Sequence, residues 1–403
     1  MLTPLCGCAS TCKQFKVRTV TDETSRFASG DFFVRRRYRD FLWLRGQLTT
    51  AFPGSIVPPL PPVDKLYKGD DRFSTQFIQR RQAGLELFLR RVADHPALTT
   101  STDLKTFLDA KVWELQTEKN KSTPSWYEKM LDTAGDGVKR VTNALTSKTP
   151  DDEAVEKLRQ FANEYHGVLA AAHAAHHSTV NTLALQAEDM HHLGPAFDLL
   201  SQTEKELSGA FNGMAVELDA LRELYLKQVQ EEHVRGLSSL LAFNAGMAAS
   251  FKDVLKNRDY SLVQYNKATQ LLDKRSKERQ AWQDGGGAAE RSQGGSPRPG
   301  GAGGVMNSMM SKMGLADDPG KGQRLANKVA EAENAVAETK QRWETISEGL
   351  ESETAKFHRM TNADFAEGLR SHAAQQIAFE QEKQKHWQAL LAEFEQVGSY
   401  STQ

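Results

Sequence analysis

An apolar stripe that alternates four and three residues apart constrains this 403-residue chain most strongly. It comprises Leu325, Val329, Ala332, Val336, Thr339, Trp343, Ile346 and Leu350, and it continues with local shifts through Phe357, Met360, Phe365, Leu369, Trp387, Leu391 and Phe394. This spacing is typical of a coiled coil. A helix of roughly 60 residues spans about 90 Å, too long for a compact monomer to cover its apolar edge. We therefore expect twofold pairing of chains through the stripe of the first and third long helices, with Trp343 and Ile346 in its clearest heptad.

Apolar periodicity predicts two further long helices before this stripe. Helix one runs from Val155 to about Leu224, with a kink or interruption expected at Gly194-Pro195 because proline removes a backbone hydrogen bond. Helix two runs from about Lys227 to Gln283. The connection from it to the third helix, residues 284–322, is rich in Gly, Ser and Pro and is predicted to be disordered.

The first 110 residues differ in composition and pattern, because basic residues outnumber acidic ones there. Strands are expected over residues 14–21 and 31–37, with a turn between them. Helices are expected from Asp40 to about Ala51, over residues 74–94 and over residues 101–108. Residues 57–62 are expected to be extended, since each proline biases its predecessor away from the helix. The pattern predicts a small α+β domain.

Three basic residues and one aromatic ring of this domain are candidates for a binding site. Arg37 and Tyr38 follow an apolar strand, Lys65 ends a proline-rich run, and Arg81 lies on a periodic helix. Guanidinium groups bind phosphate in a bidentate manner, lysine acts as a point charge, and a tyrosine face can pack on a sugar-like ring. The four residues suit a phosphorylated ring compound. The alternative is a solvated basic surface.

Three motifs in this order resemble the PX domain, the phosphoinositide-binding module of the sorting nexins. They are Arg-Arg-Tyr-x-x-Phe from Arg36, Pro-Pro-x-x-Lys from Pro61, and Arg-x-x-x-Leu-Glu-x-Phe-Leu from Arg81. The resemblance implies that Arg37 binds the 3-phosphate and Tyr38 stacks under the inositol. It also implies that Lys65 binds the 1-phosphate and Arg81 the ring hydroxyls. Residues 1–12 depart from the family, so the first strand is expected to be absent or altered.

The helical region resembles the BAR domain, a three-helix antiparallel unit that dimerises into a curved rod. The order of the segments resembles the sorting nexins that carry both domains. The run Arg-Arg-Arg-Tyr-x-Asp-Phe-Leu-Trp-Leu is most similar to the branch of sorting nexins numbered four, seven and thirty. The expected fold is therefore multidomain, α+β then all-α. Its segments are an atypical N-terminus (1–12), a PX domain (13–112), a linker (113–124), an amphipathic helix (125–148) and a BAR domain (150–403) with the insert at about 284–322.

Several segments are candidates for membrane contact, each with a plainer alternative. Candidate inserting residues are Leu66, Tyr67, Trp126, Met130, Val138, Val141, Met309 and Met310. Candidate residues for electrostatic attraction to anionic lipid are Lys139, Arg140, Lys274, Arg275, Lys277, Arg279, Lys321, Arg324 and Lys328. The alternatives are packing of the loop and the amphipathic helix on the folded domains, a disordered tether at the insert, and a solvated charged face around it.

The sequence shows no signature of an enzyme, a cofactor or a metal centre. Nucleophile-elbow, phosphate-loop, zinc-protease and dinucleotide motifs are absent. Cys6, Cys8 and Cys12 give no disulfide framework and fit a reducing compartment. The pair His173 and His177 has the spacing of half a zinc site, but the expected interpretation is ordinary helix-surface histidines. No apolar run reaches the length of a membrane span, and no signal peptide is expected. Nucleic acid binding is not expected.

Together these features predict a peripheral membrane protein of the cytoplasm. The resemblance implies binding of phosphatidylinositol 3-phosphate on the cytosolic face of early and recycling endosomes. It also implies a BAR dimer, with itself or with a related PX-BAR nexin, that senses or stabilises curvature in sorting, recycling and tubule formation, with a link to autophagy. Cargo and coat partners are not identified by the sequence. The alternative is a coiled-coil protein scaffold with a degenerate PX domain and no lipid specificity.

Overall fold

The computed structural model describes residues 2–4, 14–21, 30–61, 75–110, 152–285 and 321–400. The chain divides into two compact units. The first contains Met1–Tyr127, Glu153–Val254 and Ser352–Gln403, and the second contains Glu128–Asp152 and Leu255–Glu351. Among the described residues, no helix combines the length and the apolar character that crossing a bilayer requires.

The N-terminal domain contains a three-stranded antiparallel sheet in the order β1-β2-β3. β1 covers Leu2–Pro4, β2 covers Gln14–Thr21 and β3 covers Gly30–Arg37. The two strands predicted from the sequence are confirmed. The first strand is present rather than absent, although it is only three residues long, and it sets Leu2 opposite Val17.

Helices pack on one face of this sheet. They are α1 (Tyr38–Ala51), α2 (Thr75–Ala93), the short 3-10 helix η2 (Leu98–Thr100) and α3 (Thr102–Asp109). α3 begins at Ser101, whose hydroxyl accepts hydrogen bonds from the backbone N–H groups of Asp103 and Leu104. Such a cap satisfies N–H groups that a helix leaves without partners at its first turn.

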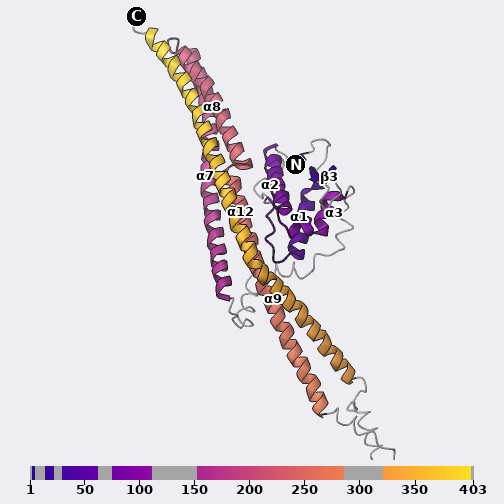
Figure 1. Cartoon of the computed structure of the whole chain (residues 1–403). Helices are drawn as coiled ribbons and strands as arrows, with labels where there is room; N and C mark the ends of the chain where they lie inside the picture. The colour runs from indigo at the N-terminus through magenta and orange to yellow at the C-terminus, as the bar shows by residue number, and fades with distance from the viewer. Residues whose placement is uncertain are drawn as a thin grey trace, which may run out of the picture. The chain divides into compact units, whose positions relative to one another are not determined.

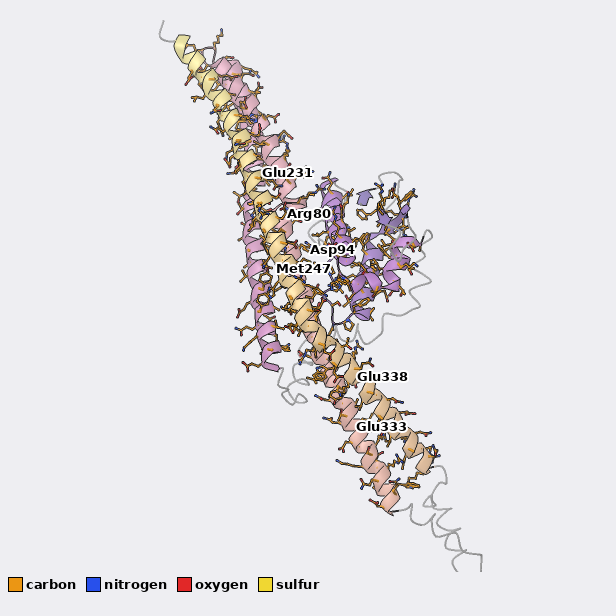
Figure 2. The ribbon with its side chains drawn as sticks, viewed as in Figure 1. Arg80, Asp94, Glu231, Met247, Glu333 and Glu338 are labelled. Atoms are coloured by element: carbon orange, nitrogen blue, oxygen red, sulfur yellow. The ribbon has the colours of Figure 1, made fainter. Side chains whose placement is uncertain are left out.

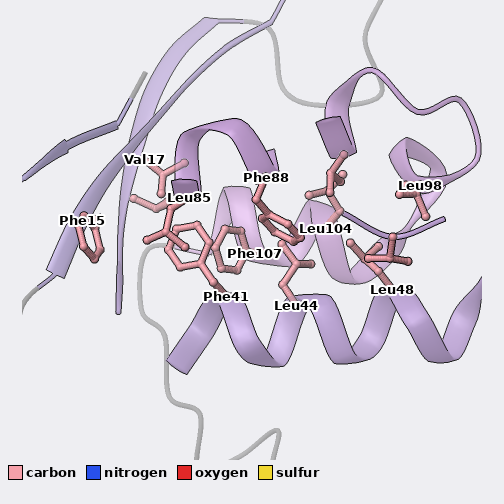
Figure 3. Close-up of a cluster of buried hydrophobic side chains, with 13 residues drawn as sticks. Phe15, Val17, Phe41, Leu44, Leu48, Leu85, Phe88, Leu98, Leu104 and Phe107 are labelled. Carbon is pink, nitrogen blue, oxygen red and sulfur yellow. The ribbon is translucent and has the colours of Figure 1, made fainter. Parts of the chain in front are cut away.

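Phe41 of α1 is the centre of the core of this domain (Figure 3). Its side chain is fully buried, and its ring makes edge contacts with the rings of Phe15, Phe88 and Phe107 at centroid distances of 6.5, 6.5 and 5.1 Å. These rings come from β2, α2 and α3. One residue of α1 therefore joins the sheet to the other two helices.

The helical part of the first unit contains α7 (Asp152–Thr203), α8 (Ser208–Val234), the beginning of α9 (Leu237–Gly285) and the end of α12 (Lys321–Tyr400) (Figure 1). α7 and α12 run in the same direction, because Tyr165 contacts Phe357 and, further along both helices, Ala187 lies in the same cluster as Phe379. Glu217 pairs with His386, Tyr225 contacts Phe379 and Glu232 pairs with His372, so α8 packs on the same core antiparallel to α12. The three-helix antiparallel arrangement is the one predicted.

Two boundaries within these helices differ from the prediction. α7 passes through Gly194 and Pro195 without a break, so the interruption expected there is wrong. The chain turns instead at residues 204–207, where the Ser208 hydroxyl donates to the Ser201 carbonyl and Phe197 packs on Phe211. The predicted second helix corresponds to two helices, α8 and α9. It begins at Ser208, and a break at Arg235 and Gly236 separates α8 from α9.

In the second unit, the rest of α9 pairs with the first part of α12. Tyr265 stacks on Trp343 with parallel rings 6.0 Å apart, and Trp282 lies against Gly322. Ile346 is buried within the chain. The prediction that Ile346 contacts a second chain is therefore wrong, because α9 already covers this part of the stripe.

Phe41→Ala should lower the free energy of unfolding of the N-terminal domain by about 3–5 kcal/mol, since it removes a fully buried aromatic ring. Its neighbour Leu42 is exposed, so Leu42→Ala is the matched control and should change stability by less than about 0.5 kcal/mol. Urea denaturation followed by circular dichroism measures both. Equal effects of the two changes would contradict the core described here.

Candidate functional site

Tyr38 and Arg81 meet at one end of the N-terminal domain. The Arg81 guanidinium on α2 lies 4.5 Å from the centroid of the Tyr38 ring and 4.2 Å from that of Phe77. Two aromatic faces attract the cation and restrict its rotation. The Tyr38 hydroxyl donates a 2.7 Å hydrogen bond to the Pro61 carbonyl, which restrains the ring at its hydroxyl end. The structure thus brings together two of the predicted site residues.

Arg37, the last residue of β3, directly precedes this ring. Its side chain is exposed, while its backbone N–H donates to the Asp40 carboxylate over 2.6 Å at the start of α1. Its neighbour Arg36 is fully buried and donates to the carbonyls of Phe107 and Ala110. Burial lowers the pKa of Arg36 to about 10, so the group stays charged at neutral pH. Alternation along the strand gives two adjacent arginines different roles, Arg36 structural and Arg37 available to a ligand.

A basic surface continues from Arg37 across the exposed face of β2 and β3. The register sets Lys16 directly opposite Arg35, a like-charge pair of the kind that destabilises a sheet. Lys16 lies 4.0 Å over the ring of Phe33, and Arg18 pairs with Asp31. The electrostatic character of this face suits an anionic ligand or surface.

Pro61 packs closely on α2 next to Arg81. A Cβ atom added at Gly84 would lie 2.9 Å from the Pro61 Cβ, closer than real contacts allow. Glycine at position 84 therefore lets the proline segment reach the Tyr38 hydroxyl. Sequence reasoning missed Phe77, Pro61 and Gly84 as parts of the site. The available signal was the spacing of Phe77 and Gly84 from Arg81, four and three residues away on one helix face.

Many other candidate residues lie outside the described part of the chain. They are Lys65, Leu66, Tyr67, Trp126, Met130, Val138, Val141, Lys139, Arg140, Met309 and Met310, together with the amphipathic helix and the insert. The predicted roles of these residues remain predictions.

The basic residues beside the insert are described, and acidic neighbours offset part of their charge. Lys277 pairs with Asp273 over 2.7 Å and Arg275 pairs with Glu278 over 2.8 Å on α9. The other members of this group are Lys274 and Arg279 on α9, and Lys321, Arg324 and Lys328 on α12. Glu333 and Glu338 are exposed further along α12 (Figure 2). Mixed charge weakens the electrostatic case for membrane contact at these helix ends.

Histidines cluster where α7, α8 and α12 meet. Nearly inaccessible Glu232 of α8 lies 3.0 Å from a ring nitrogen of both His176 and His372. His177 lies between His173 and His233, at ring centroid distances of 6.1 and 5.7 Å. The described residues contain no group of three or more ligands arranged to hold a metal ion. Glu232 of α8 thus links α7 to α12 through these two histidines.

Burial, aided by the charge of Arg80, lowers the pKa of His233 to about 4. A folded pKa below that of the unfolded chain means that the unfolded state binds the proton first. Stability should therefore fall as the pH drops from about 6.5 towards 4.

We therefore expect His233→Gln to reduce the loss of stability between pH 7 and pH 5, as measured by urea denaturation at each pH. The control is His191→Gln, because His191 is exposed on α7. The same pH dependence in His233→Gln and in the wild type would exclude a neutral, buried His233.

The chain is similar in sequence to known proteins. A model described as the PX domain matches residues 24–111. Sorting nexin-7 of Homo sapiens is 31% identical over 234 residues, 58% of this chain and 58% of that protein. Sorting nexin-4 of Cryptococcus neoformans var. neoformans serotype D is 26% identical over 372 residues, 89% of this chain and 72% of that protein. The chain thus spans 58% of the length of the human relative.

Comparison with solved structures extends over nearly the whole chain. The SNX-BAR protein Mvp1, solved as a tetramer by cryo-EM, matches with a TM-score of 0.52 and 17% identity. The match covers 97% of this chain and 99% of that one. It shows a shared fold, an α+β PX domain followed by a long helical region.

Proposed function

Since the chain carries a PX domain, is homologous to sorting nexins 4, 7 and 30 and has the fold of a SNX-BAR protein, we propose that it is a peripheral membrane adaptor that binds phosphatidylinositol 3-phosphate. Its place of action is the cytosolic face of early and recycling endosomes. There it takes part in sorting, recycling and tubule formation, with a link to autophagy. The chain acts by binding and has no catalytic role.

The guanidinium of Arg81 between two aromatic rings carries this proposal. A cation held by Tyr38 and Phe77 is positioned before any ligand arrives, so little rotamer entropy is lost on binding. Arg81 binds the ring hydroxyls and the exposed Arg37 binds the 3-phosphate with a bidentate fork. Tyr38 packs under the inositol, and Lys65 binds the 1-phosphate. The basic face of β2 and β3 attracts the anionic bilayer to the same end of the domain.

Arg37→Ala should weaken binding to vesicles containing phosphatidylinositol 3-phosphate by roughly 30- to 150-fold, because a charge-assisted hydrogen-bonding pair contributes about 2–3 kcal/mol. The matched control is Arg39→Ala, which removes the same charge from an exposed position two residues away. Co-sedimentation with vesicles that contain or lack the 3-phosphate measures both variants. Undiminished binding by folded Arg37→Ala, or no preference of the wild type for the 3-phosphate, would favour the coiled-coil scaffold instead.

Two helices of the first unit present apolar side chains that the described chain leaves exposed. On α7 they are Val168, Leu185, Leu193 and Leu199; on α12 they are Leu369, Ile377, Trp387, Leu391 and Phe394. Large apolar side chains exposed repeatedly along two helices are consistent with a protein–protein interface. We place the dimer contact here, with a second copy or a related PX-BAR nexin as partner, and assign curvature sensing to that dimer.

The double change Trp387→Ser and Leu391→Ser should convert the dimer to a monomer at micromolar concentration, because it removes two large side chains from the proposed contact. Leu42→Ser alters an equally exposed apolar residue on α1 and should leave the dimer intact. Sedimentation velocity reports the state of each protein. A wild-type monomer, or a double variant that dimerises as the wild type does, would remove the interface from these helices.

A further inference from the structure

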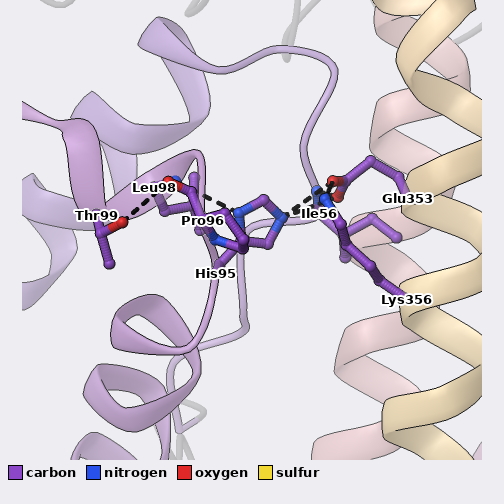
Figure 4. Close-up of polar contacts among 7 residues, drawn as sticks. All are labelled: Ile56, His95, Pro96, Leu98, Thr99, Glu353 and Lys356. Atoms are coloured by element: carbon purple, nitrogen blue, oxygen red, sulfur yellow. Dashed lines mark hydrogen bonds and ion pairs between the residues drawn. The ribbon is translucent and has the colours of Figure 1, made fainter.

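The segment Ile56–Pro61, here called the proline strap, connects the headgroup site to the helical region of the first unit. At one end the Pro61 carbonyl accepts the hydrogen bond of the Tyr38 hydroxyl. At the other end the backbone N–H of Ile56 donates a 3.0 Å hydrogen bond to the carboxylate of Glu353, on α12 (Figure 4). The two anchors are only five residues apart.

Three groups contact the carboxylate of Glu353: the Ile56 N–H, His95 and Lys356. Its side chain is buried, and its oxygens accept from the Lys356 ammonium over 2.8 Å and lie 3.1 Å from the Nε2 atom of His95. Burial alone raises the pKa of a carboxyl group, but the hydrogen bonds from His95, Lys356 and the Ile56 N–H lower the pKa of Glu353 to about 2. The carboxylate is charged at neutral pH and binds the strap with an ionic acceptor.

The middle of the strap contacts both the N-terminal domain and the helical region. Arg45 of α1 donates to the Pro58 carbonyl over 3.0 Å and to the Ser250 hydroxyl of α9 over 3.3 Å. Pro59 packs on α9 so closely that a Cβ atom at Gly246 would lie 2.7 Å from its ring. α9 and α12 therefore hold the strap together with the N-terminal domain, whose core contains Val57.

The strap contributes little to its own position. Prolines at 58, 59 and 61 have no backbone N–H, and the described part of the segment belongs to no helix or strand. Its placement must come from its neighbours. The polar partners in α12 and α9 are distant in sequence, so the N-terminal domain alone lacks them.

We infer that Glu353 is a positioning residue for the headgroup site, which it sets through the proline strap, and that the helical region thereby tunes the affinity of the PX domain. The inference rests on the proposed function. A strap held by Glu353 presents the Pro61 carbonyl where Tyr38 needs it, so the ring over Arg81 is in place before the ligand binds. Preorganisation of this kind lowers the entropy cost of binding. Coupling is reciprocal, so a bound headgroup strengthens the contact of Ile56 with Glu353.

The test uses the full chain and soluble inositol 1,3-bisphosphate, measured by isothermal titration calorimetry. A monovalent soluble headgroup removes any contribution from the bilayer or from dimer avidity. Glu353→Ala should weaken its binding about five- to thirtyfold, the effect of losing one or two charge-assisted hydrogen bonds. Glu353→Gln keeps an acceptor for the Ile56 N–H and should fall between Glu353→Ala and the wild type. The control Glu351→Ala removes an exposed carboxylate two residues away and should bind as the wild type does.

A second variant acts without changing charge. Gly246→Ala should displace Pro59 and weaken headgroup binding, while Gly167→Ala, on a helix surface with open space, should not. Amide hydrogen exchange provides a readout specific to the coupling. Headgroup should slow exchange at Ile56 in the wild type and not in Glu353→Ala.

The possible outcomes separate the two proposals. Loss of binding in Arg37→Ala, with wild-type affinity in both Glu353→Ala and Gly246→Ala, would overturn the inference and leave the proposed function standing. No binding of the headgroup by the wild type would overturn the proposed function. Weaker binding by both variants, with unchanged helix content in circular dichroism and no slowing at Ile56 in Glu353→Ala, supports the inference.

Discussion

The buried guanidinium of Arg36 fixes the end of the sheet on which the rest of the candidate site depends. It donates to two carbonyls at the end of α3, and a buried cation without such partners would be costly. Because neighbouring side chains of a strand point to opposite faces, anchoring Arg36 inward turns Arg37 outward. The next residue begins α1, so Tyr38 enters the site at a defined angle. One internal hydrogen-bonding network thus decides which of the two adjacent arginines is exposed.

Local patterns predicted the local elements well. The strand at Gln14–Thr21 has the predicted bounds, and the prolines between residues 57 and 62 indicated an extended segment. Tyr38 and Arg81 were chosen from motifs and are adjacent in the structure. The failures involve contacts distant in sequence. α7 continues through Pro195, where the sequence predicted a kink or an interruption, and nothing near Glu353 in the sequence indicates that it contacts Ile56.

The two parts of the heptad stripe share one sequence pattern but differ in burial. Its first part, around Trp343 and Ile346, is covered by α9 within the chain. Its last part, around Trp387 and Leu391, is exposed, although the spacing of the apolar residues is similar. Periodicity shows that a helix face will be covered, but it does not identify the element that covers it. That distinction depends on where α9 begins, because Leu240 near its start lies against Gly368 and the stripe continues beyond that point.

The contacts of Pro59 with Gly246 and of Pro61 with Gly84 have a consequence for how this protein tolerates change. Both glycines lie inside helices, where alanine is ordinarily the favoured residue. Here each glycine receives a rigid ring, so the two positions should reject the substitution that most helix positions accept. A smaller side chain in place of the proline, or a shift of the proline strap away from the helix, would relieve that restriction. The choice of glycine at positions 84 and 246 thus depends on the proline strap, which is adjacent to neither of them in the sequence. A change in the strap and a change at either glycine should therefore occur together.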